Sequence, residues 1–338
     1  MPVRNAGPYL DASIASILAQ THRQFELVIG DDGSTDGSSE RLGQWARRDS
    51  RISIHRCEDG LGPAGSSNWV ARLARHGIVA RMDADDVSGP RRLEAQLAAL
   101  RANPGAVLVG TLSHFIDISG RRVRPPIRSH LRDLGAHRSP FPHGSIMFRR
   151  AAFERAGGYR QACDYWEDQE LYWRMAEQGD ILVLPQVHYS HRFNPGQARI
   201  RIDTGRVERA IDRFYRCLRA REAGEDYNRL LTPDDETQVA IGPAAYRALA
   251  SLQLMSGRRP VLLGKLLRSQ GFKFDRASLA SLAWCAAALA WPAGLRLIMR
   301  IYAHAREATL GRRRFDGPLL WTPHVRRQAA LEQEAEAA

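Results

Sequence analysis

The chain of 338 residues is long enough to bury a sizeable core, so we expect one large domain with an appended region. Its formal net charge of +12 favours an anionic partner, such as a phosphorylated substrate, a nucleic acid or an anionic membrane surface. Lys265 and Lys273 are the only lysines, so a general arginine bias explains much of this charge, and no recognised nucleic-acid-binding motif accompanies it. The four cysteines lack C-x-x-C spacing, which fits a reducing compartment and argues against structural zinc.

Strands and helices alternate over the first third of the chain. Apolar residues at helical spacing predict helices, and short continuous apolar runs predict buried strands. This alternation is typical of a doubly wound α/β sheet with parallel strands, in which ligands bind beyond the carboxyl ends of the strands. The predicted strands cover residues 25–30, 51–55, 77–80 and 106–111, and the predicted helices cover residues 9–20 and 91–101 and end at Arg48 and Ala74.

Two acidic turns each follow a predicted strand. The first contains Asp31 and Asp32, and the second contains Asp83, Asp85 and Asp86. Carboxylates this crowded repel one another, and the usual compensating charge is Mg²⁺ or Mn²⁺, which takes further ligands from water and substrate phosphates. Together the turns predict a nucleotide and metal site on one rim of the sheet. The alternatives are ordinary turn chemistry for the first turn and a solvated, helix-capping turn for the second.

Asp168 is the principal candidate in the second half of the α/β region, because it opens a helix with an apolar face. The helix dipole stabilises a carboxylate there as the anion, so Asp168 could be an N-cap, a general base aimed into a cleft, or both. The other predicted elements are a hairpin over residues 115–123, a loop over residues 124–140, a strand leading into a helix over residues 143–150, and strands over residues 181–185 and 187–190.

Residues 201–338 lose the α/β pattern, and we expect a helical C-terminal region that includes a basic helix over residues 207–221. Residues 277–295 contain no charged residue, but Pro292 and Gly294 interrupt the run. This interruption favours a buried or interfacial helix over a membrane span. The arginines that follow fit a helix lying on an anionic membrane surface, and a solvated basic face is the alternative.

Six short motifs resemble those of inverting family 2 glycosyltransferases of the GT-A type, and the resemblance covers about residues 1–200. Each motif is weak alone, but their order and spacing together are specific. The resemblance implies a GT-A fold, which is a Rossmann-like, doubly wound mixed sheet, followed here by the helical region over residues 201–338. The motifs are Pro2-Val3-Arg4-Asn5-Ala6, Asp31-Asp32-Gly33-Ser34-Thr35-Asp36, Met82-Asp83-Ala84-Asp85-Asp86, residues 143–150, Gly157-Gly158-Tyr159 and Glu167-Asp168.

The resemblance also implies a reaction. A sugar moves from a nucleotide-diphosphate sugar to an acceptor hydroxyl in a single in-line displacement that inverts the anomeric carbon. A base deprotonates the hydroxyl, and Mn²⁺ or Mg²⁺ offsets the charge on the departing diphosphate. The implied roles are nucleotide binding by Pro2, Val3, Arg4, Asn5, Asp32 and Asp83, metal binding by Asp85 and Asp86, base catalysis by Asp168, and an acceptor side formed by His143, Trp166 and Glu167.

The sequence departs from the family pattern in three places. The apolar strand that normally precedes Pro2 is missing, so the first strand is apparently truncated. We expect the true start to lie upstream and a longer chain to be more stable. An arginine that often helps to hold the nucleotide corresponds to Ser66 or Ser67, and Arg72 and Arg81 are the candidates to compensate.

The third departure concerns the metal. A histidine that often helps to ligate the cation near the end of the domain corresponds to Asn194. His191 lies three residues earlier, and a surface or packing histidine is the alternative reading of that residue.

These features favour an enzyme of cell-surface polysaccharide or glycolipid synthesis that acts in the cytoplasm on a saccharide or lipid-linked acceptor, with peripheral contact to the inner face of the membrane as a further expectation. The alternative is a degenerate, non-catalytic protein that binds sugar nucleotides or polysaccharide. A sugar-nucleotide pyrophosphorylase would need an N-terminal glycine-rich phosphate loop with Lys or Arg, which the sequence lacks. The motifs do not fix the sugar, because donor selectivity comes from side chains in variable loops.

Overall fold

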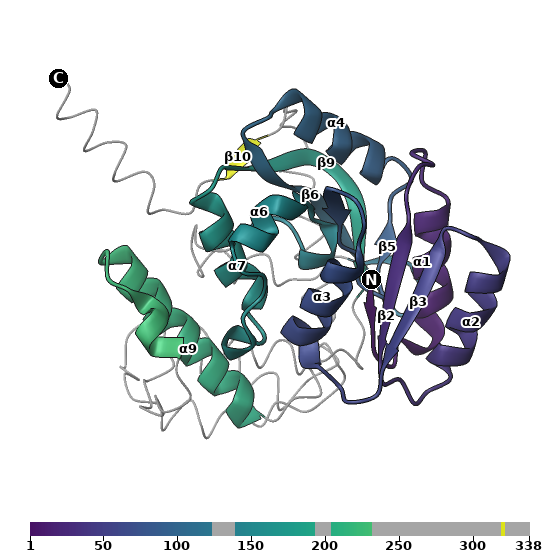
Figure 1. Cartoon of the computed structure of the whole chain (residues 1–338), viewed down its shortest axis with the longest axis horizontal. Coiled ribbons are helices and arrows are strands. Elements are labelled where there is room, and N and C mark those ends of the chain that lie inside the picture. Colours follow the sequence, from purple (N-terminus) through teal and green to yellow (C-terminus); the bar gives the residue numbers. More distant parts are fainter. Residues whose placement is uncertain (124–138, 193–203, 232–318, 322–338) are drawn as a thin grey trace. The chain divides into compact units, whose positions relative to one another are not determined.

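The computed structural model describes residues 1–123, 139–192, 204–231 and 319–321 (Figure 1). These residues fall into two units. The first unit holds residues 1–116 and 139–192 together with β10 (Leu319–Trp321), and the second holds residues 117–123 and 204–231. The domain division at residue 200 stays a prediction, although β10 lies beyond that residue and still belongs to the first unit.

The second unit contains a turn and a basic helix. The N–H of Asp117 donates to the carbonyl of Arg121 at 2.9 Å, just before β7 (Arg122–Val123). α9 (Thr204–Glu222) is the predicted basic helix, and η5 (Tyr227–Leu231) follows it. None of the helices in the described ranges is long and apolar enough to cross a membrane, and residues 277–295 lie outside those ranges.

Three strands of the first unit form a parallel sheet in the order β1 (Pro2–Val3), β2 (Leu27–Asp32) and β3 (Ile52–Cys57). Pro2 pairs with Gly30, and Val3 pairs with Asp31. The residues predicted to be a loop from Pro2 onward are therefore a short strand at first, and the loop begins only at Arg4.

Helices cover both faces of this sheet. α1 (Leu10–Leu18) and α2 (Ser38–Arg48) lie on one side, and α3 (Gly62–Leu73) lies on the other (Figure 1). α3 approaches β2 so closely that a Cβ atom on Gly30 would lie 2.3 Å from a side-chain carbon of Val70. Glycine is required at that position because no larger residue fits between the helix and the strand.

The second sheet of the first unit is mixed, as expected for the GT-A fold. Its order is β10, β9 (Asp180–Arg192), β6 (Ala106–Ile116), β8 (Met147–Arg149) and β4 (Ile78–Ala80), with β5 (Val87–Ser88) paired to β9. Of these pairs, only that between β6 and β9 is parallel.

β9 corrects one prediction, because the two strands expected at residues 181–185 and 187–190 are one continuous strand. Its pairing with β6 advances from Leu184–Thr111 to Val187–Leu112, which leaves two residues in a bulge. One of them is Pro185, which cannot donate a ladder hydrogen bond and is confined to such places within a sheet.

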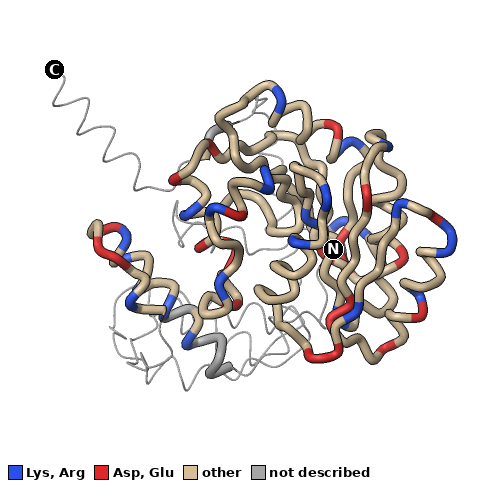
Figure 2. The backbone as a smooth tube through the Cα atoms, in the orientation of Figure 1, with Lys and Arg blue, Asp and Glu red and all other residues tan. Residues whose placement is uncertain are grey.

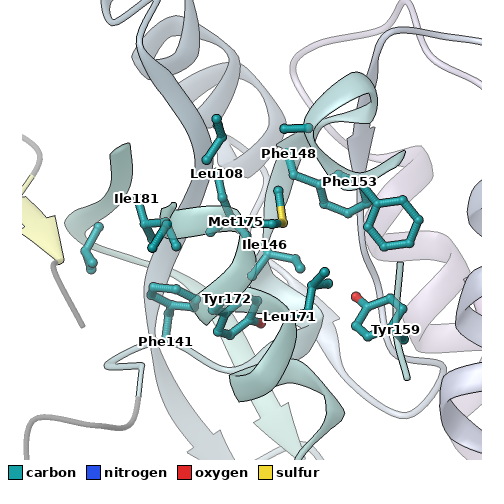
Figure 3. Packing of buried hydrophobic residues seen from close by; sticks show 14 of the residues in the cluster. Leu108, Phe141, Ile146, Phe148, Phe153, Tyr159, Leu171, Tyr172, Met175 and Ile181 are labelled. Carbon is teal, nitrogen blue, oxygen red and sulfur yellow. The ribbon is translucent and has the colours of Figure 1, made fainter. Parts of the chain in front are cut away.

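The main core of the first unit lies between the mixed sheet and α7 (Glu167–Ala176), which is buried along its whole length (Figure 3). α4 (Arg92–Ala102), α6 (Arg150–Arg155) and three short 3₁₀ helices complete the unit, namely η1 (Gly7–Tyr9), η3 (His143–Ser145) and η4 (Gln161–Cys163). Burying α7 fixes the position of its first turn, which carries Glu167 and Asp168.

Candidate active site

The turn that carries Asp83, Asp85 and Asp86, called the acidic turn from here on, lies between β4 and β5. An arginine holds its first carboxylate. Acidic and basic residues are interspersed along the described chain (Figure 2), so charge alone marks no site there. The guanidinium of Arg81 pairs with Asp83 at 3.0 Å and donates to the hydroxyl of Ser67 at 2.7 Å. Arg81 thus reaches Ser67, one of the two serines at the position of the family arginine, and its role as the compensating arginine stays a prediction. Burial opposes its charge, but Asp83 raises the pKa of Arg81 above its ordinary value.

Asp86 is anchored to the end of β9. One carboxylate oxygen accepts the backbone N–H of Arg192 at 2.6 Å, and the other lies 3.2 Å from Nδ1 of His191. The guanidinium of Arg192 also donates to the carbonyl of Asp85 at 2.7 Å. Because its side chain is fully buried and both oxygens have protein partners, Asp86 holds the turn in place, and its role as a metal ligand stays a prediction.

His191 has a structural partner as well. Its ring packs edge-on against Phe115, with 5.3 Å between the centroids. Burial lowers the pKa of His191, but Asp86 outweighs that effect and raises it to about 9. The packing alternative for His191 is therefore the one that the contacts support, and Asn194 lies outside the described residues.

Asp85 is the carboxylate of this turn that can take a cation. Burial and repulsion from Asp86 and Asp83 raise its pKa to about 7. This excess of negative charge is what a divalent cation offsets. Among the residues that the structure describes, no three His, Cys, Asp or Glu side chains converge on one point. The donor set therefore fits a cation held by one carboxylate, waters and substrate phosphates, which is usual for Mg²⁺.

Asp31 and Asp32, predicted to lie in a turn, are the last two residues of β2, and Asp32 contacts both the segment after β1 and the loop before α3. The backbone N–H of Leu61 donates to Asp32 at 2.6 Å, and the guanidinium of Arg4 lies 3.6 Å from the other carboxylate oxygen. Asn5 has φ of +51° and joins the two loops, because its side chain accepts the N–H of Thr35 at 2.8 Å. Val3 differs from the prediction, since its side chain is buried in the core.

Asp168 occupies the second residue of α7, so the N-cap prediction is wrong. The N-cap is Trp166, and no side chain caps the helix there. The backbone N–H and the side-chain amide of Gln169 donate to the two oxygens of Asp168 at 2.9 and 3.0 Å. Gln169 is itself held by the backbone N–H of Ser139 at 2.8 Å, so the carboxylate of Asp168 is fixed in orientation.

The predicted acceptor-side residues do not all lie together. Nε2 of His143 lies 2.8 Å from the hydroxyl of Tyr159, and Nδ1 lies 3.9 Å from a carboxylate oxygen of Glu167. Trp166 instead points into the protein, where its ring packs against Trp173 at 5.9 Å. Trp166 therefore supports α7 and does not form an open wall of the site.

Tyr159 connects the acidic turn with α7. Burial is the main reason that its pKa lies above the ordinary value, and the charges of Glu167, Asp168 and Asp83 add to the increase while Arg81 opposes it. Carboxylates from both predicted halves of the site therefore act on one phenol. The sequence flagged Tyr159 only as part of the Gly157-Gly158-Tyr159 motif and gave it no role.

Comparisons with known proteins show the family. Residues 1–157 match the family described as Glycosyl transferase family 2. The putative glycosyltransferase EpsE of Bacillus subtilis is 32% identical over 240 residues, which span 69% of this chain and 86% of that protein. The O-antigen biosynthesis glycosyltransferase WbnJ of Escherichia coli is 30% identical over 221 residues, 64% of this chain and 84% of that protein. The chain therefore belongs to glycosyltransferase family 2 and is a nucleotide-sugar-dependent transferase.

A solved structure agrees with the fold. The mannosyltransferase PcManGT from Pyrobaculum calidifontis, in complex with GDP-Man and Mn²⁺, matches with a TM-score of 0.50 at 20% sequence identity. The match covers 92% of this chain and 86% of that chain. At this identity it concerns the fold alone, and it agrees with the GT-A architecture predicted from the motifs.

Proposed function

We propose that this chain is an inverting glycosyltransferase that moves a sugar from a nucleotide-diphosphate sugar to a hydroxyl of a saccharide or lipid-linked acceptor. The observation that carries the proposal is a series of contacts that joins separate halves of the sequence. Arg81 pairs with Asp83 and lies over the ring of Tyr159, and the Tyr159 hydroxyl contacts His143, which faces Glu167 next to Asp168. The relative WbnJ is named as an O-antigen biosynthesis glycosyltransferase, which supports cell-surface polysaccharide or glycolipid as the product class. We expect the enzyme to work in the cytoplasm at the inner face of the membrane.

The donor nucleotide would bind against Arg4, Asn5 and Asp32. The Asp32 carboxylate would accept hydrogen bonds from the base, after Arg4 moves away from it. Asp83 would contact the ribose or diphosphate, and Arg81 fixes its orientation by a two-atom contact with that carboxylate. Pro2 contributes through the backbone at the edge of this site.

Asp85 would hold a divalent cation, Mn²⁺ or Mg²⁺, together with the donor diphosphate. When bound, the cation stabilises the negative charge that develops on the leaving nucleoside diphosphate. Asp86 would act indirectly. Its carboxylate and the carbonyl of Asp85 both accept hydrogen bonds from Arg192, which fixes the backbone that carries the Asp85 side chain.

Asp168 would remove the proton from the acceptor hydroxyl as that oxygen attacks the anomeric carbon. The contacts from Gln169 hold its carboxylate in one orientation, which a general base requires. The acceptor oxygen forms a bond to the anomeric carbon as the bond to the diphosphate breaks, so a single displacement inverts the anomeric configuration. The nucleoside diphosphate is the leaving group. Glu167 and His143 would border the acceptor.

The test begins with a thermal-shift screen of UDP-, GDP- and dTDP-sugars in the presence of Mn²⁺. We expect one nucleotide class to raise the melting temperature and to release its nucleoside diphosphate on incubation. Binding with no turnover for any donor, with or without saccharide acceptors, would reject the transferase mechanism and favour the non-catalytic alternative. The absence of binding to all three classes would reject the donor site.

A further inference from the structure

Tyr159 is held in place by the donor-side helix α3. The backbone N–H of Tyr159 donates to the side-chain oxygen of Asn68 at 2.8 Å, and the side-chain nitrogen of Asn68 donates to the carbonyl of Tyr159 at 2.7 Å. Gly158 allows this approach, because it has φ of +69° and a Cβ atom there would lie 2.5 Å from the Asn68 oxygen. The position of Tyr159 is therefore set by α3, next to Ser67 and Arg81.

The phenol of Tyr159 points the other way, toward the predicted acceptor side. Its oxygen lies 2.8 Å from Nε2 of His143, and the two rings are 5.2 Å apart. The opposite ring nitrogen of His143 faces the carboxylate of Glu167 at 3.9 Å. A proton on Nδ1 is favoured by that carboxylate, which leaves Nε2 as the acceptor of the Tyr159 hydroxyl. The three side chains form a line that ends beside Asp168.

Tyr172 provides an internal comparison. It belongs to the same buried core as Tyr159 (Figure 3). Its ring centre lies 6.5 Å from that of His143. Its hydroxyl is buried and makes no hydrogen bond with any residue that the structure describes. Two tyrosines in one core therefore differ in one respect that matters here: only Tyr159 holds the imidazole of His143.

We propose that Tyr159 is a positioning residue for the acceptor side, which fixes the tautomer and the orientation of His143 and, through it, the carboxylate of Glu167 beside Asp168. Tyr159 touches neither donor nor acceptor in this role. The inference rests on the proposed function, because Asp168 defines the acceptor side only if the chain transfers a sugar. It gives the Gly157-Gly158-Tyr159 motif a physical purpose: the glycine lets α3 fix the tyrosine, and the tyrosine fixes the histidine.

The experiment compares Tyr159→Phe with Tyr172→Phe, since each removes one buried hydroxyl and keeps the ring. The first readout is the pair of imidazole ¹⁵N signals of His143, assigned with His143→Gln. We expect these signals to move in Tyr159→Phe and to stay in place in Tyr172→Phe. The second readout is steady-state release of nucleoside diphosphate from the donor, with water as acceptor. We expect kcat to fall about five- to tenfold in Tyr159→Phe, as for the loss of one hydrogen bond, with the donor KM unchanged.

A double variant separates this role from general stability. If Tyr159 acts through His143, adding Tyr159→Phe to His143→Gln should cause no further loss of kcat. Equal effects of the two Phe variants on His143, or a fall in kcat that persists in the His143→Gln background, would overturn the proposal. A wild-type protein that turns over no donor would reject the proposed function instead, and the ¹⁵N signals would still report whether Tyr159 holds His143.

Discussion

The acidic turn and the first turn of α7 each carry two adjacent carboxylates, and in each pair the two side chains face different surroundings. In the acidic turn, Asp86 is fully buried and bound to the end of β9, whereas Asp85 is crowded by like charges and keeps partial exposure. In α7, Glu167 faces His143, whereas Asp168 is braced by the residue that follows it.

The difference shows that a segment distant in the sequence can contact one of two adjacent carboxylates and leave the other. Residues adjacent in a turn or a helix point in different directions, so only one of them can be held by a given packed element. The end of β9 binds the carboxylate of Asp86. His143 of η3, which Tyr159 contacts, faces the carboxylate of Glu167. Within the described part of the chain, Asp85 is left without such a contact to its carboxylate, and Asp168 is held only by Gln169, the residue that follows it. Substitutions within each pair should therefore have opposite signatures, and the predictions below test this.

The largest effect is expected for Asp168→Asn. The amide keeps the size of the side chain but cannot take a proton, so sugar transfer should fall by about 10²–10⁴-fold. Binding of the nucleotide with Mn²⁺, measured by calorimetry, should stay the same because Asp168 is not part of the donor site. Glu167→Gln is the matched variant, for which we expect a smaller loss of turnover. Equal activity of wild type and Asp168→Asn would remove Asp168 from the mechanism.

The acidic turn should separate into a ligand and an anchor. Asp85→Asn should weaken Mn²⁺-dependent binding of nucleoside diphosphate by about a hundredfold, because the cation loses its protein carboxylate. Without metal, the variant should be at least as stable as wild type, because the change removes a charge that burial and the neighbouring aspartates disfavour. Isothermal titration with and without Mn²⁺ measures the change in affinity. Unchanged affinity in both conditions would reject Asp85 as the ligand.

Asp86→Asn should show the reverse pattern. It removes the charge that faces His191 and weakens the anchor on β9, so we expect a loss of about 3–5 kcal/mol in the free energy of unfolding, measured by denaturant titration. Mn²⁺ binding should weaken less than in Asp85→Asn. If Asp86→Asn were as stable as wild type but unable to bind Mn²⁺, the assignment of the two aspartates would have to be exchanged.

Arg81→Met should weaken donor binding by about ten- to hundredfold, because the buried contact that orients Asp83 is a charge-assisted one. Arg72→Met is the control, since Arg72 is an exposed residue of α3 and the other arginine that the sequence offered. Fluorescence titration with a labelled nucleotide diphosphate compares the two. Similar affinities of both variants would remove Arg81 from the donor site.

The smallest effect concerns pH. Asp85 has a pKa of about 7 in the folded protein and 3.8 as its ordinary value, so between these values the folded state holds a proton that the unfolded state releases. This group's contribution to stability is present at low pH and is lost as the pH rises through about 7. Because Mn²⁺ competes with that proton, the rise in melting temperature caused by Mn²⁺ should grow from about pH 6 to about pH 8. In Asp85→Asn that growth should disappear.

Local patterns predicted the elements and the carboxylates of the site. Asp83, Asp85 and Asp86 follow β4 as the strand–helix alternation indicated, Asp31 and Asp32 end β2 instead of following it, and the family motifs identified Asp85 and Asp168 as candidates. Apolar periodicity is a local property, so α1, α4, β2, β3 and β4 were found within about two residues of their observed bounds, whereas β1 and β5 were missed and β6 extends beyond its predicted end to Ile116. The bulge in β9 was missed because Pro185 reads as the end of a strand when the pairing partner is unknown.

Long-range contacts were the part that the sequence could not provide. The bond between Asp86 and His191 joins residues 105 positions apart, and the bonds between Asn68 and Tyr159 span 91 positions. Nothing local distinguishes Asp86, which is anchored, from Asp85, which is not. The role of Arg81 was left open for the same reason, because its contact with Ser67 depends on how β4 meets α3.

The central claim is that the acidic turn and α7 face one shared site, and paramagnetic broadening by Mn²⁺ tests it most directly. The protein would be titrated with Mn²⁺ in the presence of the nucleoside diphosphate that binds, while the backbone NMR signals of α7 are followed. We predict strong broadening of the Asp168 and Gln169 amide signals, and its loss in Asp85→Asn. Unaffected Asp168 and Gln169 signals, at a Mn²⁺ concentration that supports nucleotide binding, would contradict the account.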